Sequence, residues 1–393
     1  MILIKQGHVF APENLGICDI LIGGNQILAV EKNINAGTLP GKVREIDARG
    51  MVVVPGFIDG HQHFTGGGGE DGFKSRVPEM RLSANIANGV TTAVGLLGTD
   101  SLTRTVESLY ARTRALNDEG MTALMLTGAY WLPSPTVCGS VGRDITFLDP
   151  VIGVKLAISD HRAACYDTPA LAALAREVRV AAMVSGKPGI ITLHTGADPA
   201  GLDMLIEATD RFGIKAGTFV PTHVNLRTSA VADQAFALAR QGSFADATCL
   251  ARTPDRKGAM THAADFAAAA EAAGVFEQVC FSSDAGGSLP RWNPDRTKLL
   301  GMGMGTPDTL ITELQHLVRD HNMDLSRALL PLTLTPARVY GLSGKKGALC
   351  PGAHADILVL EKDSLEIRDV MAKGRVMMAD NTLEIREYFS SGK

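Results

Sequence analysis

Two histidines, His61 and His63, stand two residues apart just after an apolar, β-branched run at residues 52–58. Side chains alternate between the two faces of a strand, so residues i and i+2 point the same way. Two imidazoles that leave one face at a strand end can reach a single metal ion. The plainer interpretation is a pair of histidines on a solvated loop, so the choice depends on what else the chain supplies.

Further reactive side chains lie on, or just after, other apolar runs of the chain. They are Thr99, Tyr130, Lys155, His194, His223 and Asp284. A single strand histidine is more often a satisfied core residue than a ligand. Several such residues on separate strand ends are hard to obtain by chance, and together they predict one shared site.

The charges of these groups indicate what such a site could hold. Two divalent metal ions would bring four positive charges, which neutral histidines do not offset. Asp284 and a bridging hydroxide would each supply one negative charge, whereas a protonated Lys155 would add repulsion. Addition of carbon dioxide to the neutral amine gives an anionic, bidentate carbamate that could bridge two ions. A buried ion pair of Lys155 is the alternative.

Eight apolar or β-branched runs would position these residues, and they alternate with alanine- and leucine-rich segments of helical spacing. The runs are residues 52–58, 91–97, 123–126, 151–159, 189–194, 218–224, 243–248 and 279–283. This alternation predicts a (β/α)8 TIM-like barrel, in which reactive residues come from the carboxyl ends of several strands. A doubly wound open sheet is the rival, but no glycine-rich dinucleotide fingerprint follows any run.

Both ends of the chain consist of short strand-like pieces separated by turns. Because chain ends often lie close together, we expect one small β-sandwich domain built from both termini. The predicted organisation is residues 1–53 for its first part, 54–343 for a metal-dependent barrel and 344–393 for its second part.

Composition excludes several classes of protein. The 393 residues carry a net charge of −4 without a basic block, so we expect neither nucleic acid nor a membrane as a partner. No segment is long and apolar enough to predict a membrane helix. The six cysteines are scattered and form no CxxC motif, which predicts reduced, mostly buried thiols and a cytoplasmic protein.

The motifs PGFIDGHQH and SSDAG, with one strand lysine and two strand histidines between them, resemble the amidohydrolase superfamily. Within it, the chain is most similar to the isoaspartyl (β-aspartyl) dipeptidases. The strings that carry this resemblance are HFTGGGGE (63–70), GLLGTD (95–100), LTGAYWLPSPT (126–136), GVKLAISDHR (153–162), PTHVN (221–225) and SSDAGGS (282–288).

This resemblance implies two Zn²⁺ or other divalent ions bridged by a carboxylated Lys155. One ion would be bound by His61, His63 and Asp284, and the other by His194 and His223. It also implies a homo-oligomer, with an octamer as the expected form.

The implied reaction is hydrolysis of the isoaspartyl bond of a dipeptide by a bridging hydroxide. Asp284 would act as general base and acid, and Tyr130 would donate a hydrogen bond to the developing oxyanion.

Charge also predicts the substrate contacts. Glu70 follows four glycines and would suit a free α-amino group, whereas Arg162 would bind a carboxylate. Thr99 and Ser288 would add neutral hydrogen bonds. We expect Arg227 to complete the carboxylate site.

The sequence departs from the family pattern at one point. In that pattern a second arginine directly follows HVN, whereas here this position is Leu226. We expect a one-residue bulge that turns Leu226 aside and brings Arg227 to the pocket. Two other functions remain open: another amidohydrolase, such as an N-acyl-amino-acid deacylase or cyclic amidase, and a non-catalytic scaffold. An acylated or cyclic substrate would lack the amine that Glu70 suits, and a scaffold would not need the full ligand set.

Overall fold

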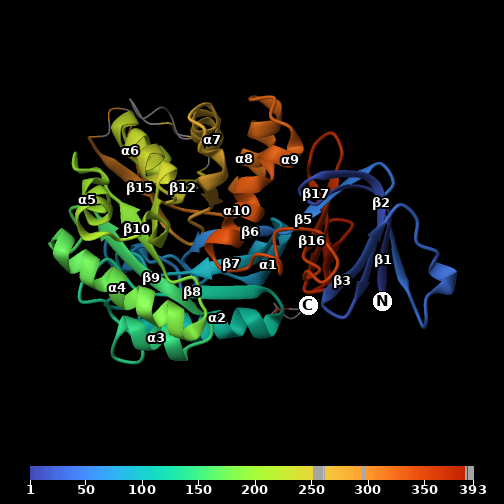
Figure 1. Ribbon diagram of the computed structural model, residues 1–393, viewed down its shortest axis with the longest axis horizontal. Helices are drawn as coiled ribbons and strands as arrows, with labels where there is room; N and C mark the ends of the chain where they lie inside the picture. Colours follow the sequence, from blue (N-terminus) through green and yellow to red (C-terminus); the bar gives the residue numbers. More distant parts are fainter. Residues whose placement is uncertain (251–259, 261, 294, 296, 386, 388–393) are drawn as a thin grey trace.

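The computed structural model describes residues 1–250, 260, 262–293, 295, 297–385 and 387. Figure 1 shows an α/β body with its strands surrounded by helices, and a separate β-sheet beside it that contains both the N-terminal strands and the last strands. This arrangement confirms the predicted fold class.

The body contains a parallel sheet of eight strands, hydrogen-bonded in sequence order from β6 to β13. Its strands are β6 (Phe57–Gln62), β7 (Val90–Gly95), β8 (Thr122–Gly128), β9 (Val151–Ile158), β10 (Ile190–Thr195), β11 (Phe219–Thr222), β12 (Ala245–Thr248) and β13 (Val279–Ser282). A parallel bridge between Gln62 and Ala285 links the first strand to the segment after the last. The sheet is therefore almost closed into the predicted barrel.

Helices cover the outside of this barrel. They are α1 (Leu82–Ala87), α2 (Val106–Glu119), α3 (Val141–Phe147), α4 (Thr168–Ser185), α5 (Asp203–Phe212), α6 (Ser229–Arg240), α7 (Ala263–Ala272), α8 (Asp308–Arg319), α9 (Leu325–Ala328) and α10 (Leu334–Val339). Local signals set the bounds of α4: the Asp167 side chain accepts from the Ala170 amide before the first turn, and Gly186 ends the helix with left-handed backbone. The barrel core lies between these helices and the strands.

The first apolar run is divided, whereas the sequence predicted one strand there. β5 (Met51–Pro55) pairs with strands of the terminal sheet, and β6 starts the barrel two residues later. Gly56 lies at the crossing, where its amide donates to the Asp356 carbonyl and a Cβ atom would collide with the Thr91 side chain. The chain thus passes from one sheet to the other at Pro55–Gly56.

The terminal sheet has nine strands and its own apolar core. Its other strands are β1 (Ile2–Phe10), β2 (Asn14–Gly23), β3 (Gln26–Glu31), β4 (Arg44–Asp47), β16 (Ile357–Glu361), β17 (Ile367–Ala372), β18 (Arg375–Ala379) and β19 (Thr382–Leu383). β16 pairs antiparallel with β5, which joins the two ends of the chain in one sheet.

The sequence did not predict a two-stranded antiparallel hairpin that follows the last barrel strand. It consists of β14 (Ser288–Trp292) and β15 (Leu299–Met304). No helix in the described residues is long and apolar enough to cross a membrane. All six cysteines are free thiols, but only Cys18, Cys249 and Cys280 are buried. The prediction of mostly buried thiols was therefore wrong for the other half.

Candidate active site

A cavity of about 620 Å³ opens at the carboxyl ends of the barrel strands. Its lining includes most of the side chains that the sequence predicted: His63, Glu70, Thr99, Tyr130, Arg162, His194, His223, Arg227, Asp284 and Ser288. His61 and Lys155 lie fully buried within the same cluster. The fold therefore brings every predicted site residue to one end of the barrel.

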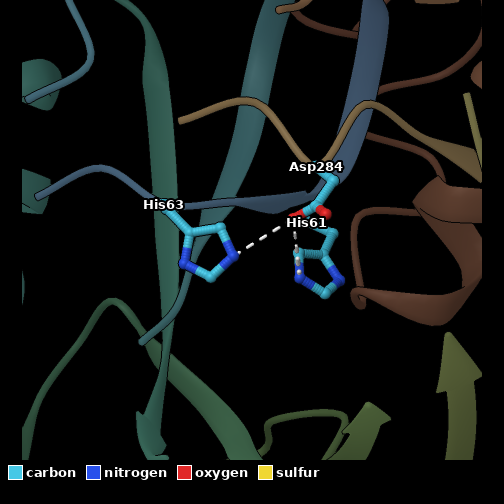
Figure 2. A group of neighbouring side chains, drawn as sticks. All are labelled: His61, His63 and Asp284. Atoms are coloured by element: carbon cyan, nitrogen blue, oxygen red, sulfur yellow. Dashed lines mark hydrogen bonds and ion pairs between the residues drawn. The ribbon is translucent and has the colours of Figure 1, made fainter. Parts of the chain in front are cut away.

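The first three candidate ligands face one another (Figure 2). Asp284 Oδ1 lies 3.1 Å from His63 Nε2 and 3.5 Å from His61 Nε2, and the three ligand atoms lie within 4.8 Å of one another. His61 and His63 come from β6 and its end, whereas Asp284 follows β13, so closure of the barrel creates this group. Two imidazoles and a carboxylate are a ligand set that suits zinc.

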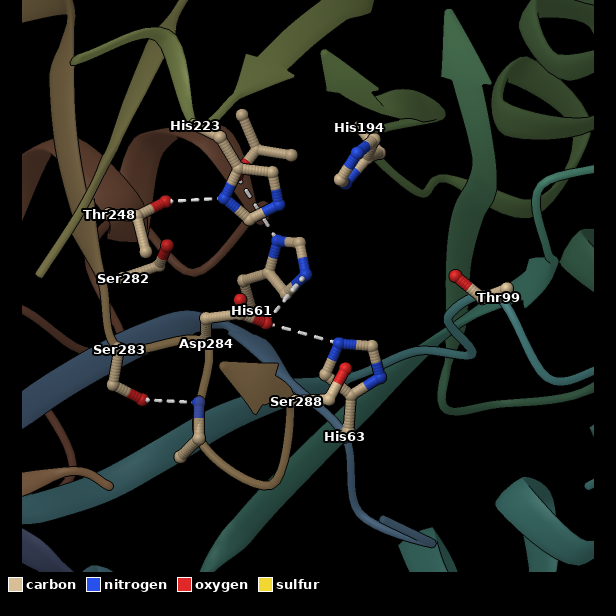
Figure 3. A network of polar contacts seen from close by, with 12 residues as sticks. His61, His63, Thr99, His194, His223, Thr248, Ser282, Ser283, Asp284 and Ser288 are labelled. Carbon is tan, nitrogen blue, oxygen red and sulfur yellow. Dashed lines mark hydrogen bonds and ion pairs between the residues drawn. The ribbon is translucent and has the colours of Figure 1, made fainter. Parts of the chain in front are cut away.

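Threonine hydroxyl groups contact the Nδ1 atoms of His61 and His223 (Figure 3). His61 Nδ1 lies 3.2 Å from Thr222 Oγ1, and His223 Nδ1 lies 2.7 Å from Thr248 Oγ1. Thr222 in turn donates to the carboxylate of Asp246, at 2.6 Å. Such outer contacts fix ring orientation in metal sites and leave Nε2 of both histidines facing the centre of the cluster.

His194 is oriented differently. Its Nε2 atom lies 3.0 Å from Asp160 Oδ2, and its Nδ1 atom lies 2.7 Å from the Tyr130 hydroxyl. Burial would raise the pKa of Asp160, but hydrogen bonds from Arg162 and His194 outweigh it and hold that pKa far below its usual range. Asp160 is thus a fixed anion that orients His194 and leaves Nδ1 on the cavity side.

Burial keeps the histidines in the form that binds metals. It lowers the pKa of His194 to about 4 and the pKa values of His61 and His223 well below their ordinary value, and the nearby Lys155 lowers all three further. Neutral imidazole is the metal-ligating form, so these three rings need lose no proton to bind an ion near neutral pH.

Lys155 is the least satisfied group of the cluster. Its Nζ atom is buried and has no hydrogen-bond partner in the part of the chain that the structure describes. Burial lowers the pKa of Lys155 to about 7, against the opposing influence of Asp284 and Asp246. An unpaired buried amine is costly, and one whose pKa is about 7 is partly neutral near pH 7, so its neutral form is able to react with carbon dioxide. The donor set therefore fits a pair of divalent ions with a modified lysine.

Opposite charges face each other at the outer part of the cavity. Glu70 Oε1 accepts from Ser288 Oγ at 2.8 Å and lies 3.5 Å from Arg162 Nη1, which also donates to Thr99 Oγ1 at 3.1 Å. The Glu70 and Arg162 side chains are 25% and 29% exposed, so both remain within reach of a ligand. This group can bind a molecule that carries both an amine and a carboxylate.

The glycine-rich loop that carries Glu70 is held by a buried arginine that the sequence did not single out. The Arg104 guanidinium donates to the carbonyl oxygens of Thr65, Gly67 and Val77. Gly66 has a positive φ of 76°, and a Cβ atom there would collide with the Val77 carbonyl oxygen. Only glycine allows this close approach.

The segment after β11 departs from an ordinary strand end. His223 has left-handed backbone (φ 65°), and a 3-10 helix, η4 (Val224–Leu226), follows it. Arg227 lines the cavity and donates through Nε to the Thr195 carbonyl at 2.6 Å. Leu226 also lines the cavity, so it is not turned aside as the sequence suggested.

The groups that orient the ligands were not predicted from the sequence. They are Asp160, Thr222, Asp246 and Thr248. The sequence signal for Asp246 is a lone carboxylate within the short strand β12. In the structure Asp246 is 2% exposed. Burial raises its pKa to about 7 despite hydrogen bonds from Thr222 and Ser282. Asp160 lies only two residues before Arg162, within a string that already carried the resemblance.

Known proteins share both the sequence and the architecture of this chain. The model of the amidohydrolase family matches residues 190–377. The structure of a beta-aspartyl dipeptidase from Fervidobacterium islandicum AW-1, in complex with a beta-Asp-Leu dipeptide, superposes with a TM-score of 0.91. It is 34% identical, and the match covers 99% of this chain and 98% of that one.

Two curated relatives match over shorter stretches. A dihydroorotase from Streptococcus pyogenes serotype M3 is 36% identical over 111 residues, which are 28% of this chain and 25% of that enzyme. A 5-methylthioadenosine/S-adenosylhomocysteine deaminase from Thermococcus kodakarensis is 52% identical over 66 residues, 16% of this chain and 14% of that enzyme. The chain thus spans a quarter or less of either curated relative. Together with the near-complete structural match, these findings show that the chain is a hydrolytic enzyme of the amidohydrolase family, within the group that contains the β-aspartyl dipeptidases.

Proposed function

We propose that this enzyme hydrolyses the β-aspartyl (isoaspartyl) peptide bond of small dipeptides. The observation that carries the proposal is the placement of Glu70 and Arg162 on one side of the cavity that also exposes the histidine–aspartate cluster. An isoaspartyl dipeptide has a free α-amine and two carboxylates around one amide bond. A site with both charges at its outer part and metal ligands beneath is complementary to that pattern.

The buried cluster would hold two divalent metal ions, with zinc the simplest choice for its imidazoles. One would be bound by His61, His63 and Asp284, the other by His194 and His223, with carboxylated Lys155 shared between them. When bound, such ions lower the pKa of a coordinated water to about 7 and polarise the amide carbonyl.

Two residues would assist bond cleavage directly. Asp284 would take the proton of the attacking water and pass it to the leaving amine, which needs a carboxylate that reaches the centre of the cluster. Burial raises the pKa of Tyr130 well above its ordinary value, so the phenol stays protonated and can donate to the oxyanion. Its present contact is His194 Nδ1, and it would exchange that contact for the substrate oxygen.

The outer residues would orient the dipeptide. Glu70 would bind the α-amine, and Arg162 and Arg227 would bind carboxylates. Thr99 and Ser288 already contact Arg162 and Glu70, so they would steady both charged groups and add hydrogen bonds. Contacts that these groups make with each other in the free enzyme would be exchanged for contacts with the substrate.

A second candidate is another amide hydrolysis on the same fold, such as deacylation of an N-acyl amino acid or opening of a cyclic amide. It retains the metal chemistry but leaves Glu70 without a cationic partner on the substrate. A non-catalytic scaffold would not require the complete ligand set. We also expect a homo-oligomer, with an octamer as the expected form, and a cytoplasmic location in keeping with six free thiols.

The test is hydrolysis of isoAsp-Leu, Asp-Leu and N-acetylaspartate by one preparation whose metal content is measured. The proposal predicts two metal ions per chain and turnover of isoAsp-Leu far above the other two. Preferential turnover of N-acetylaspartate would move the assignment to a deacylase, and no turnover of any amide by the metal-loaded protein would favour a scaffold.

A further inference from the structure

A second cluster of metal-binding side chains lies outside the proposed active site, between the neighbouring helices α7 and α8 (Figure 1). His262 immediately precedes α7, and Glu313 and His316 belong to α8. Residues three apart on a helix share one face, so the two α8 side chains point together toward the start of α7. The three ligand atoms lie within 4.8 Å of one another.

The cluster has the proportions of a metal site that is closed on one side. His262 Nδ1 lies 3.1 Å from Glu313 Oε1, and the two imidazole centroids lie 5.2 Å apart. Ligands in a tetrahedral zinc site stand roughly 3.3–3.5 Å from one another, given bonds of about 2.0–2.1 Å. Small side-chain rotations would close the remaining gap. The Glu313 side chain is 1% exposed, whereas the histidines are 20% and 17% exposed and admit an ion from solvent.

Neighbouring groups already hold the ligands in place. Glu313 Oε2 accepts from the Ala264 amide at 2.9 Å, which leaves Oε1 directed at His262. His316 Nδ1 lies 3.5 Å from Asp320 Oδ2, one turn along α8. A carboxylate that orients a ligating histidine and a backbone amide that orients a ligating carboxylate are typical outer contacts of metal sites.

We propose that His262, Glu313 and His316 form a further metal site for a divalent transition metal ion such as zinc, which would cross-link α7 to α8. It shares no residue with the proposed catalytic cluster. The competing view is a buried ion pair between a protonated His262 and Glu313. The positive end of α7 opposes a cation here, but the Glu313 charge beside the first turn offsets it. An ion pair between His262 and Glu313 does not require a third donor, whereas His316 supplies one at the same point.

The experiment measures zinc bound by the full-length protein after chelation and reloading with Zn²⁺ and bicarbonate. His316→Gln is the main variant. His321→Gln is the matched control, because His321 follows the same helix and pairs with Asp265 but does not belong to the cluster. We expect His316→Gln to bind one zinc ion fewer per chain than the wild type, and His321→Gln to bind the same number. The increase in Tm on adding zinc should be smaller in His316→Gln alone.

The difference between variants does not depend on how many ions the catalytic cluster holds or on which substrate is cleaved, so failure here is separable from failure of the proposed function. If His316→Gln does not fold, His262→Gln replaces it, since that side chain is partly exposed as well. Equal zinc content and equal zinc-dependent Tm shifts in wild type and variant would show an ion pair and overturn the proposal.

Discussion

The cavity has two parts that are built differently. The floor consists of the cluster on or next to the barrel strands, which is buried except for the partly exposed Asp284: His61, His63, Lys155, His194, His223 and Asp284. The rim consists of side chains from the connecting segments: Glu70, Thr99, Arg162, Arg227 and Ser288. Floor groups are held by strand geometry and by outer partners such as Thr222 and Thr248. Rim groups are partly exposed, and Glu70, Thr99, Arg162 and Ser288 contact one another. Arg162 also pairs with Asp160, and Arg227 donates to the Thr195 carbonyl.

This difference suggests a division of labour. Strand ends of a closed barrel move little, so the floor can keep donors at fixed distances for bond cleavage. Loop-borne groups can exchange partners, so the rim can select a substrate by its charges. The proposed function thus assigns turnover to the floor and selectivity to the rim, and substitutions in each part should separate the two.

The largest effect should come from the floor. Lys155→Ala removes the group that we propose to bridge two ions, so the protein should lose most of its metal and at least about 10³-fold in turnover of isoAsp-Leu. Short carboxylic acids added to the variant should restore part of both, because they can occupy the space of the carbamate. A fully active alanine variant with two bound ions would remove Lys155 from the site.

Tyr130→Phe removes one hydroxyl beside the floor, the one that contacts His194, without substituting a proposed ligand. Loss of one oxyanion donor usually lowers turnover by roughly 10²–10³-fold. We expect that loss in kcat, with metal content as in the wild type. Unchanged turnover would exclude Tyr130 from the reaction, whereas a loss of metal would instead point to its contact with His194.

On the rim, Arg227→Ala should raise KM for isoAsp-Leu and leave kcat and metal content nearly unchanged. Charged hydrogen bonds contribute about 1.5–3 kcal/mol, which corresponds to a rise of roughly 10- to 100-fold. Leu226→Ala is the matched control, because Leu226 lines the same cavity without a charge. Equal, mild effects of the two substitutions would place the carboxylate site elsewhere.

A pH effect should be smallest. Only the neutral amine of Lys155 reacts with carbon dioxide, and its pKa is lowered to about 7, so the reactive fraction rises as pH increases through that value. Reloading of metal-free protein at fixed dissolved carbon dioxide should therefore be about tenfold faster at pH 8 than at pH 6.

Burial also raises the pKa of Asp246 to about 7, so Asp246→Asn is the control for this experiment. Because the Asp246 charge raises the pKa of Lys155, its loss should move the pH dependence to lower pH without abolishing it. A rate of metal uptake that is flat between pH 6 and pH 8 would argue against a carbamate on Lys155.

The two parts also differ in how far the sequence predicts them. The floor residues could be predicted from strand periodicity. A histidine or lysine on, or just after, an apolar strand of a barrel has few possible side-chain directions. The rim depends on loop backbone: the left-handed His223 and the helix after it brought both Leu226 and Arg227 to the cavity. Periodicity carries no information about hydrogen-bond partners that lie far apart in the sequence. The Thr222–Asp246 contact and the contacts of Arg104 were therefore not predicted.

The division of the first apolar run at Pro55–Gly56 also depends on partners that are distant in sequence. Pro55 and Gly56 mark an irregularity in the apolar run, but they do not indicate which sheet each half joins. Only the pairing of β5 with β16, some three hundred residues later in the chain, separates β5 from β6. By contrast, the alternation of strands and helices predicted the barrel directly, because each connection there is local.

The central claim of the proposed function is that Glu70 selects the free α-amine of the substrate. The measurement is the ratio of kcat/KM for isoAsp-Leu to kcat/KM for N-acetyl-isoAsp-Leu, in the wild type and in Glu70→Gln at equal metal content. We expect a large ratio for the wild type, and a fall toward one in the variant that comes from slower isoAsp-Leu hydrolysis. Equal hydrolysis of both compounds by the wild type, or a ratio unaffected by Glu70→Gln, would contradict this claim.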